Sequence, residues 1–179
     1  MPFSNNIINS LPSLARATVE EYTNNGNIIN FDSIDFDGYK DKQAGVFVTI
    51  HSQGKLRGCI GTISPTQKNI IIETVINSIS ASTRDSRFYP VQKEELNNLT
   101  YSVSLLMSPE PIDSQDMLDP KNYGVIVTSG NKRGLLLPNL EGINTIEQQL
   151  FHAKSKAGIG NGDEIQLFRF QSIEFKEKE

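Results

Sequence analysis

The sequence predicts an α+β fold in which most strands pair antiparallel. Apolar residues recur at helical spacing in three segments, and segments that alternate apolar and polar residues are joined by short turns. Hairpins outnumber strand–helix–strand crossovers, which favours a mostly antiparallel sheet with about three main helices. A length of 179 residues suits one compact domain, 1–179, built of two lobes.

The three helical segments are residues 11–22, a segment that begins at Ser64 and runs to Ser82, and one that begins at Asn144 and stops at Gly158. Each opens on a side chain that can cap a helix, which is Ser10, Ser64 or Asn144. Pro12 and Pro65 suit first turns, Gly26 closes the first helix, and Glu147 follows Asn144 at capping-box spacing.

The strand patterns come in pairs. Residues 45–51 and 56–62 flank the turn 52–55, and residues 123–128 and 134–137 flank Gly130–Asn131, so each pair predicts a hairpin. Residues 99–107 predict a strand that ends at two prolines, and residues 165–175 predict a final strand or two. Residues 30–42 are mainly loop.

Composition excludes several classes of protein. The net charge of −4 argues against binding along a nucleic-acid backbone, which needs a basic surface. The apolar runs are too short to span a bilayer, and the first residues lack the pattern of a signal peptide. A single cysteine forms no internal disulfide, so we expect a cytoplasmic protein without membrane attachment.

The other polar clusters do not predict a site. His51 and His152 lack the spaced carboxylates of a zinc site. An acidic loop holds Asp32, Asp35 and Asp37, but no glutamate follows them at the spacing of a calcium-binding loop. The nearest basic patch is best interpreted as solvated charge, and it consists of Lys132, Arg133, Lys154 and Lys156. We therefore predict neither a metal nor a cofactor.

The segment Leu56–Thr62 (LRGCIGT) is the most distinctive part of the chain, and it holds the only cysteine. In an extended strand Arg57 and Cys59 share one face, and a nearby guanidinium would lower the pKa of the thiol. That would suit a nucleophile, a redox sensor or an anion site. The alternative is that Cys59 is a small buried apolar residue, as many free cysteines are.

A second candidate is the loop that follows the second helix, residues 84–90 (RDSRFYP). Asp85 could hold one of its neighbours Arg84 and Arg87 and leave the other to bind a carboxylate or phosphate. The alternative is a structural ion pair in a loop that Phe88 anchors in the core.

Both segments, together with residues 102–110, 134–138 and 156–158, resemble the AMMECR family. The family is named after the Alport syndrome, mental retardation, midface hypoplasia and elliptocytosis chromosomal region, and its prokaryotic members are also called AmmeMemoRadiSam system protein A. The resemblance covers nearly the whole chain. It implies a two-lobed α+β domain and a cleft around Arg57 and Cys59, with the arginine-bearing loop nearby.

The resemblance implies no settled reaction. It implies an accessory or regulatory role, with a Memo-type protein or a radical SAM enzyme as the expected partner. The expected ligand-binding residues are Arg57, Gly58, Gly61, Thr62, Arg84, Asp85 and Arg87. Lys154 stands where many relatives have a second cysteine, which argues against a two-cysteine redox mechanism.

Two functions remain open at this point. The first is a binding or accessory module, in which the arginines hold a small anionic ligand or a protein partner. The second is an enzyme with Cys59 as the catalytic nucleophile and Arg57 stabilising the developing charge. The first is favoured, because a cysteine nucleophile normally needs a nearby base. The enzyme stays open because His51 could face Cys59 across the hairpin and serve as that base.

Overall fold

The computed structural model describes residues 9–34 and 36–177. The chain divides into two compact units, of which unit 1 comprises the residues up to Leu106 together with those from Glu174 onward. Unit 2 runs from Met107 to Ile173. Each unit contains a four-stranded sheet, and the predicted antiparallel α+β fold is confirmed.

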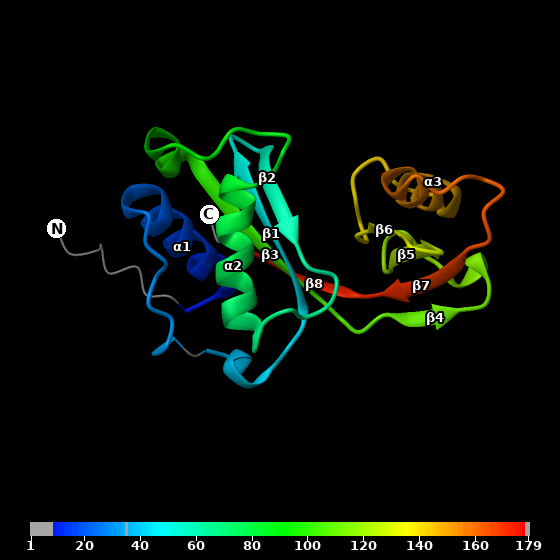
Figure 1. Cartoon of the computed structure of the whole chain (residues 1–179), viewed down its shortest axis with the longest axis horizontal. Helices are drawn as coiled ribbons and strands as arrows, with labels where there is room; N and C mark the ends of the chain where they lie inside the picture. The colour runs from blue at the N-terminus through cyan, green and yellow to red at the C-terminus, as the bar shows by residue number, and fades with distance from the viewer. Residues whose placement is uncertain (1–8, 35, 178–179) are drawn as a thin grey trace. The chain divides into compact units, whose positions relative to one another are not determined.

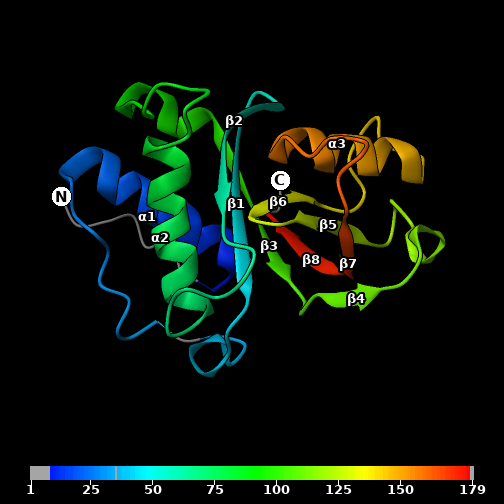
Figure 2. The same ribbon diagram turned by 45° about the vertical axis from the view of Figure 1, so that its right-hand side comes forward.

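Unit 1 is built on a sheet of order β2-β1-β3-β8, with two helices packed against one face (Figures 1 and 2). Helix α2 lies over β1 and β2, and α1 lies over β3 and against α2. The elements of this unit are α1 (Leu11–Asn25), η1 (Tyr39–Asp41), β1 (Gly45–Ser52), β2 (Lys55–Gly61), α2 (Ile70–Thr83), η2 (Lys93–Asn98), β3 (Leu99–Leu106) and β8 (Ser172–Lys176).

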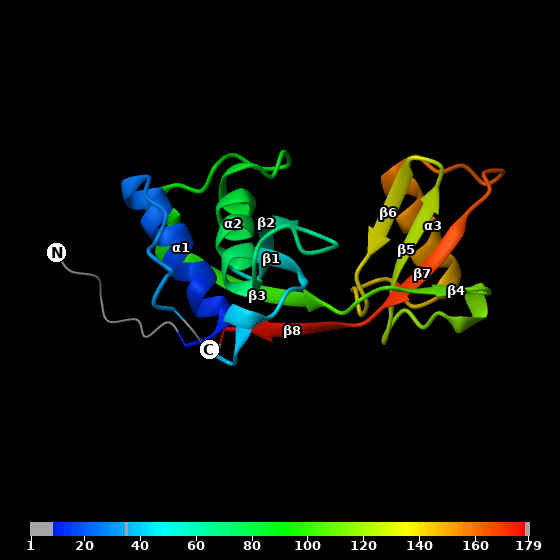
Figure 3. The ribbon, with the colours of Figure 1, turned by 60° about the horizontal axis from the view of Figure 1, so that its bottom comes forward.

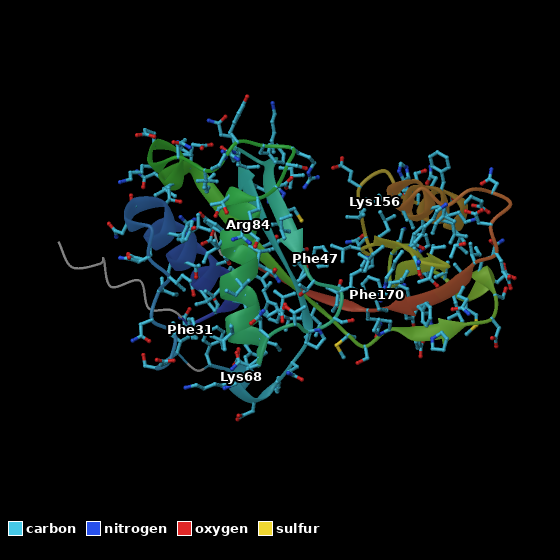
Figure 4. The ribbon with its side chains drawn as sticks, viewed as in Figure 1. Phe31, Phe47, Lys68, Arg84, Lys156 and Phe170 are labelled. Carbon is cyan, nitrogen blue, oxygen red and sulfur yellow. The ribbon has the colours of Figure 1, made fainter. Side chains whose placement is uncertain are left out.

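The core of unit 1 follows from the alternation of β1. Val46, Val48 and Ile50 are fully buried in one cluster with residues of both helices. Phe47 and Thr49 therefore project from the opposite face of the sheet, since successive side chains of a strand alternate. Phe47, which is labelled in Figure 4, therefore lies on the same second face as Thr49.

Unit 2 repeats the plan with one helix. Its sheet has the order β4-β7-β5-β6, and α3 packs on β5 and β6 (Figure 3). Gly134 allows the helix to approach β6, because a Cβ there would lie only 1.9 Å from the carbonyl oxygen of Ala153. The elements are β4 (Glu110–Ile112), η3 (Gln115–Met117), β5 (Gly124–Ser129), β6 (Lys132–Leu136), α3 (Ile146–Ala157) and β7 (Gln166–Phe170).

Several predicted elements are confirmed in detail. The first helix has Ser10 as its cap and a capping box with Ser13, and Gly26 ends it in the left-handed conformation at φ 72°. Residues 45–52 and 55–61 form the predicted hairpin, and β5 and β6 form the other.

Two helix starts were predicted wrongly. The second helix begins at Ile70 with Asn69 as its cap, rather than at Ser64, because the buried Glu73 carboxylate binds residues 62–67 in a loop. The third helix is capped by Thr145, which forms its capping box with Gln148. The sequence offers Asn144 and Glu147 one residue earlier, and only the packed helix distinguishes the two registers.

A partly buried ion pair fastens the residue after β8 to helix α1. Glu177 accepts hydrogen bonds from Arg16, at 2.6 Å from Nε and 2.8 Å from Nη2, and from the backbone N–H of Tyr101 at 2.9 Å. The same Nη2 donates to the carbonyl oxygen of Leu99 at 2.6 Å. Helix α1, strand β3 and the residue after β8 are thus joined by one guanidinium.

We predict that Glu177→Gln lowers the free energy of unfolding by about 1 to 2 kcal/mol, because it removes a charge-assisted, two-pronged contact. Urea unfolding followed by circular dichroism measures the loss. Glu174→Gln is the control, since Glu174 forms an exposed ion pair with Lys176, and its loss should change stability little. Equal losses in the two variants would contradict the role given to Glu177.

Candidate functional site

The motif Leu56–Thr62 lies mostly on β2, at one edge of the sheet of unit 1. Cys59 lies directly opposite Thr49 of β1, and the sulfur is 3.3 Å from the Thr49 hydroxyl. Thr49 in turn lies opposite Ser102 of β3. A row of one thiol and two hydroxyl side chains therefore crosses three strands on the face that the helices do not contact.

The guanidinium of Arg57 has a partner of its own. The register of β1 and β2 slips between Ile50 and His51, so Arg57 is the extra residue of a β-bulge. Its side chain makes a bidentate ion pair with Glu95 of η2, at 2.7 and 2.9 Å, and is only 15% exposed. Side chains do not alternate regularly between the two faces across a bulge. The strand pattern therefore gives no reason to place Arg57 on the same face as Cys59.

The loop 84–90, which we call the arginine loop, lies along the free edge of β2. The Asp85 side chain is 5% exposed and accepts a hydrogen bond from the backbone N–H of Cys59 at 2.9 Å. Arg87 donates to the same carboxylate from Nε at 2.9 Å and from Nη2 at 2.7 Å. Arg87 Nη2 also lies 3.5 Å from the carbonyl oxygen of Cys59. The guanidinium beside the Cys59 backbone is therefore that of Arg87.

These contacts set the ionisation of the pair. The hydrogen bonds from Arg87 hold the pKa of Asp85 far below its usual range, and they outweigh the opposing effect of burial. The N–H of Cys59 acts in the same direction. The pKa of Arg87 is raised, chiefly by its hydrogen bonds to Asp85 and further by the negative charge of that carboxylate. Asp85 and Arg87 are therefore ionised together.

The two arginines of the loop differ in what they offer a ligand. Asp85 binds Arg87 and not Arg84, so one of the two outcomes foreseen from the sequence is selected. Arg84, labelled in Figure 4, follows α2 as its C-cap, and its exposed side chain makes no hydrogen bond or ion pair with the residues of 9–34 and 36–177. Arg87 is still 55% exposed despite its pair.

Phe88 links the loop to the bulge. The guanidinium carbons of Arg57 and Arg87 lie 5.9 Å and 5.5 Å from the centre of its ring, within the range of cation–π contact. The alternative interpretation of the loop has Phe88 anchoring it in the core, but Phe88 is only half-buried. Its ring lies close to both guanidinium groups.

The two predicted glycines are explained by space. A Cβ on Gly58 would lie 2.3 Å from the carbonyl oxygen of Ala81 in α2, and one on Gly61 would lie 2.3 Å from the ring of Phe47. Both positions thus lack room for any larger residue. Packing therefore accounts for both glycines in the motif. The structure identifies no backbone group of either glycine that is placed to bind a ligand.

Thr62 belongs to a buried network around Glu73. The Glu73 carboxylate is 1% exposed and accepts hydrogen bonds from the hydroxyls of Thr62 and Thr66 and from two backbone N–H groups. Burial alone would raise the pKa of Glu73, but these donors outweigh it and lower the pKa. Thr62 is thus engaged within the fold, at the end of β2.

The structure brings three of the predicted residues together, Cys59, Asp85 and Arg87, and leaves Arg84 beside them. Arg57 instead forms an ion pair with Glu95, and Thr62 donates a hydrogen bond to Glu73. Sequence reasoning missed both glutamates and the Cys59–Thr49–Ser102 row. Alternation in residues 101–105 could have placed Ser102 opposite the core, but no local signal pairs Arg57 with a residue 38 positions away.

His51 does not face Cys59. It lies opposite Leu56 in the hairpin, and Thr49 occupies the position that an activating base would need. Within residues 9–34 and 36–177 there is no group of three or more metal-ligating side chains, and no helix there is long and apolar enough to cross a membrane.

We predict that Gly58→Ala lowers the free energy of unfolding by about 1 to 3 kcal/mol, because the new methyl must push β2 away from α2. Chemical denaturation at neutral pH gives the difference from the wild type. Gly162→Ala is the matched control, since a Cβ there meets no atom within 4 Å. A neutral effect of Gly58→Ala would show that the strand and helix can separate without cost.

A second prediction concerns acid. Because the pKa of Asp85 is lower in the folded than in the unfolded state, its contribution to stability is complete above about pH 4 and is lost as the pH falls further. Asp85→Asn should therefore be less stable than the wild type at neutral pH, and the difference should shrink in acid. Unfolding midpoints across this range test it, with exposed Asp113→Asn as the control; a constant difference would contradict it.

Comparison with known proteins identifies the family. The AMMECR1 family model matches residues 12–175. A protein of Thermotoga maritima is 44% identical over 160 residues, which cover 88% of this chain and 92% of that protein. The crystal structure of an uncharacterised Pyrococcus horikoshii protein, PH0010, is similar with a TM-score of 0.85 and 31% identity, and covers 94% of this chain and 90% of that one.

In a further relative, a segment similar to this chain is part of a longer protein. A Clostridium acetobutylicum protein is 45% identical over 166 residues, which cover 92% of this chain but only 35% of that protein. The family model and the close relatives both span nearly the whole of the present sequence. The chain therefore belongs to the AMMECR1 family of uncharacterised proteins.

Proposed function

We propose that unit 1 is a binding module whose arginine loop holds a carboxylate or phosphate group beside Cys59. The observation that carries the proposal is the separation of charge in this loop. Its one carboxylate, on Asp85, is buried and fully engaged, whereas the two guanidinium groups reach solvent. Within the loop itself, an anion would therefore meet two positive side chains and no exposed carboxylate.

The geometry also supports binding more than chemistry at Cys59. The sulfur has the Thr49 hydroxyl at 3.3 Å, and a hydroxyl is too weak a base to activate a nucleophile unaided. The enzyme alternative draws its support from the guanidinium of Arg87, which lies 3.5 Å from the carbonyl oxygen of Cys59. In that alternative Arg87, not Arg57, stabilises the negative charge.

The accessory role extends this proposal. We keep a Memo-type or radical SAM protein as the proposed partner and the cytoplasm as the proposed compartment, as the family resemblance and the lone cysteine suggest. The longer Clostridium relative supports a module that works beside another polypeptide, because there the matching segment is joined to additional sequence.

The test is a titration of the isotopically labelled protein with inorganic phosphate and with glutarate, followed by backbone amide shifts. We expect the largest shifts at residues 84–88 and at Cys59, and weaker binding as salt screens the charges. Arg84→Ala should weaken binding about tenfold or more, since a charge-assisted hydrogen bond contributes about 1.5 to 3 kcal/mol. Cys59→Ser should leave binding unchanged.

Arg133→Ala is the matched control, because Arg133 is an exposed arginine on β6 of unit 2 and lies outside the site. Equal affinity in Arg84→Ala and Arg133→Ala, or shifts that avoid the arginine loop, would overturn the proposal. A strong effect of Cys59→Ser with no effect of Arg84→Ala would favour the enzyme alternative.

A further inference from the structure

The arginine loop presents one side chain that the fold does not use. Tyr89 is 90% exposed, the largest exposed fraction among the large apolar and aromatic side chains of the described residues. Because its ring faces solvent, Tyr89 buries little apolar surface and so adds little to folding stability. Phe88 before it is half-buried and Val91 is buried, whereas Tyr89 and Pro90 between them are exposed.

The loop is held rigidly in this arrangement. At its end Val91 N–H donates to the carbonyl oxygen of Ser82 at 2.8 Å, and Phe88 N–H donates to that of Asp85 at 3.0 Å. The Asp85 carboxylate ties the start of the loop to β2 through the backbone N–H of Cys59. Tyr89 is therefore presented by a preorganised backbone, which reduces the ordering entropy that a binding partner must overcome.

The outward side chains are of the types that dominate protein interfaces. Tyrosine and arginine are enriched among the residues that carry most of the binding energy, and here Tyr89 lies two residues from Arg87 and five from Arg84. The two guanidinium groups complement carboxylates, while the tyrosine ring offers a rigid apolar surface.

We propose that Arg84, Arg87 and Tyr89 form a docking surface for an acidic segment of another polypeptide. The inference rests on the proposed function and narrows it from an anion to a peptide that also covers the Tyr89 ring. A polypeptide is favoured over a nucleic acid because the chain carries a net charge of −4. The longer Clostridium relative, in which this module is joined to further polypeptide, points the same way.

Selection from a library of short random peptides displayed on phage tests the docking surface on the full chain. We expect enrichment of peptides that combine Asp or Glu with one large apolar residue. Tyr89→Ala should weaken binding of the selected peptides about tenfold or more, and Arg84→Ala by a similar factor. Phe151→Ala is the matched control, since Phe151 is an aromatic side chain of α3 with 64% exposure. This variant should bind the selected peptides with the affinity of the wild type.

The outcomes separate the two proposals. If the selected acidic peptides lose affinity with Arg84→Ala but not with Tyr89→Ala, the loop binds anions and the docking surface is overturned. If no peptide is enriched while phosphate still shifts residues 84–88, the same conclusion holds. If neither peptide nor phosphate binds, both proposals fail. Binding of a uridine oligonucleotide through Tyr89, in the absence of peptide binding, would overturn the peptide as the partner.

Discussion

The buried carboxylate of Asp85 is the contact on which the surroundings of the motif depend. An edge strand leaves backbone groups without partners, and Cys59 lies on such an edge. Asp85 accepts the N–H of Cys59, and Arg87 lies beside its carbonyl oxygen, so this ion pair takes the place of a neighbouring strand. Burial of the carboxylate is tolerable only because several donors surround it. The position of the loop and the ionisation of Asp85 therefore depend on the same contacts.

The packing and polar contacts of the fold explain most residue types in the motif. Gly58 and Gly61 lie where α2 and Phe47 leave no room for a side chain. Thr62 supplies a hydroxyl to the buried Glu73, and Arg57 is held by Glu95. What the fold does not require is the thiol of Cys59 and the exposed groups of the arginine loop. Function is most reasonably sought in that remainder, because selection for stability does not account for it.

The Cys59–Thr49–Ser102 row and the arginine loop meet at one residue. Cys59 projects its side chain onto the polar face of the sheet, while its backbone binds the loop along the edge. A ligand held by Arg84 or Arg87 would therefore lie next to the row. This proximity is the reason that binding at the loop and reactivity at the thiol must be separated by variants of each, rather than by a single measurement.

The sequence by itself determined the α+β class, the hairpins, the first helix with its cap and the family, because these depend on local periodicity, turn residues and a distinctive motif. The tertiary structure alone decided that Arg87 rather than Arg84 pairs with Asp85, and that Arg57 belongs to Glu95. It also placed Thr49 rather than His51 opposite Cys59, and began the second helix at Ile70. The partners of Arg57 and Cys59 depend on a strand register and on contacts between distant residues, about which spacing along the chain carries no information. The pairing of Arg87 and the start of the second helix depend on how the Asp85 and Glu73 carboxylates are buried, which only the packed structure decides.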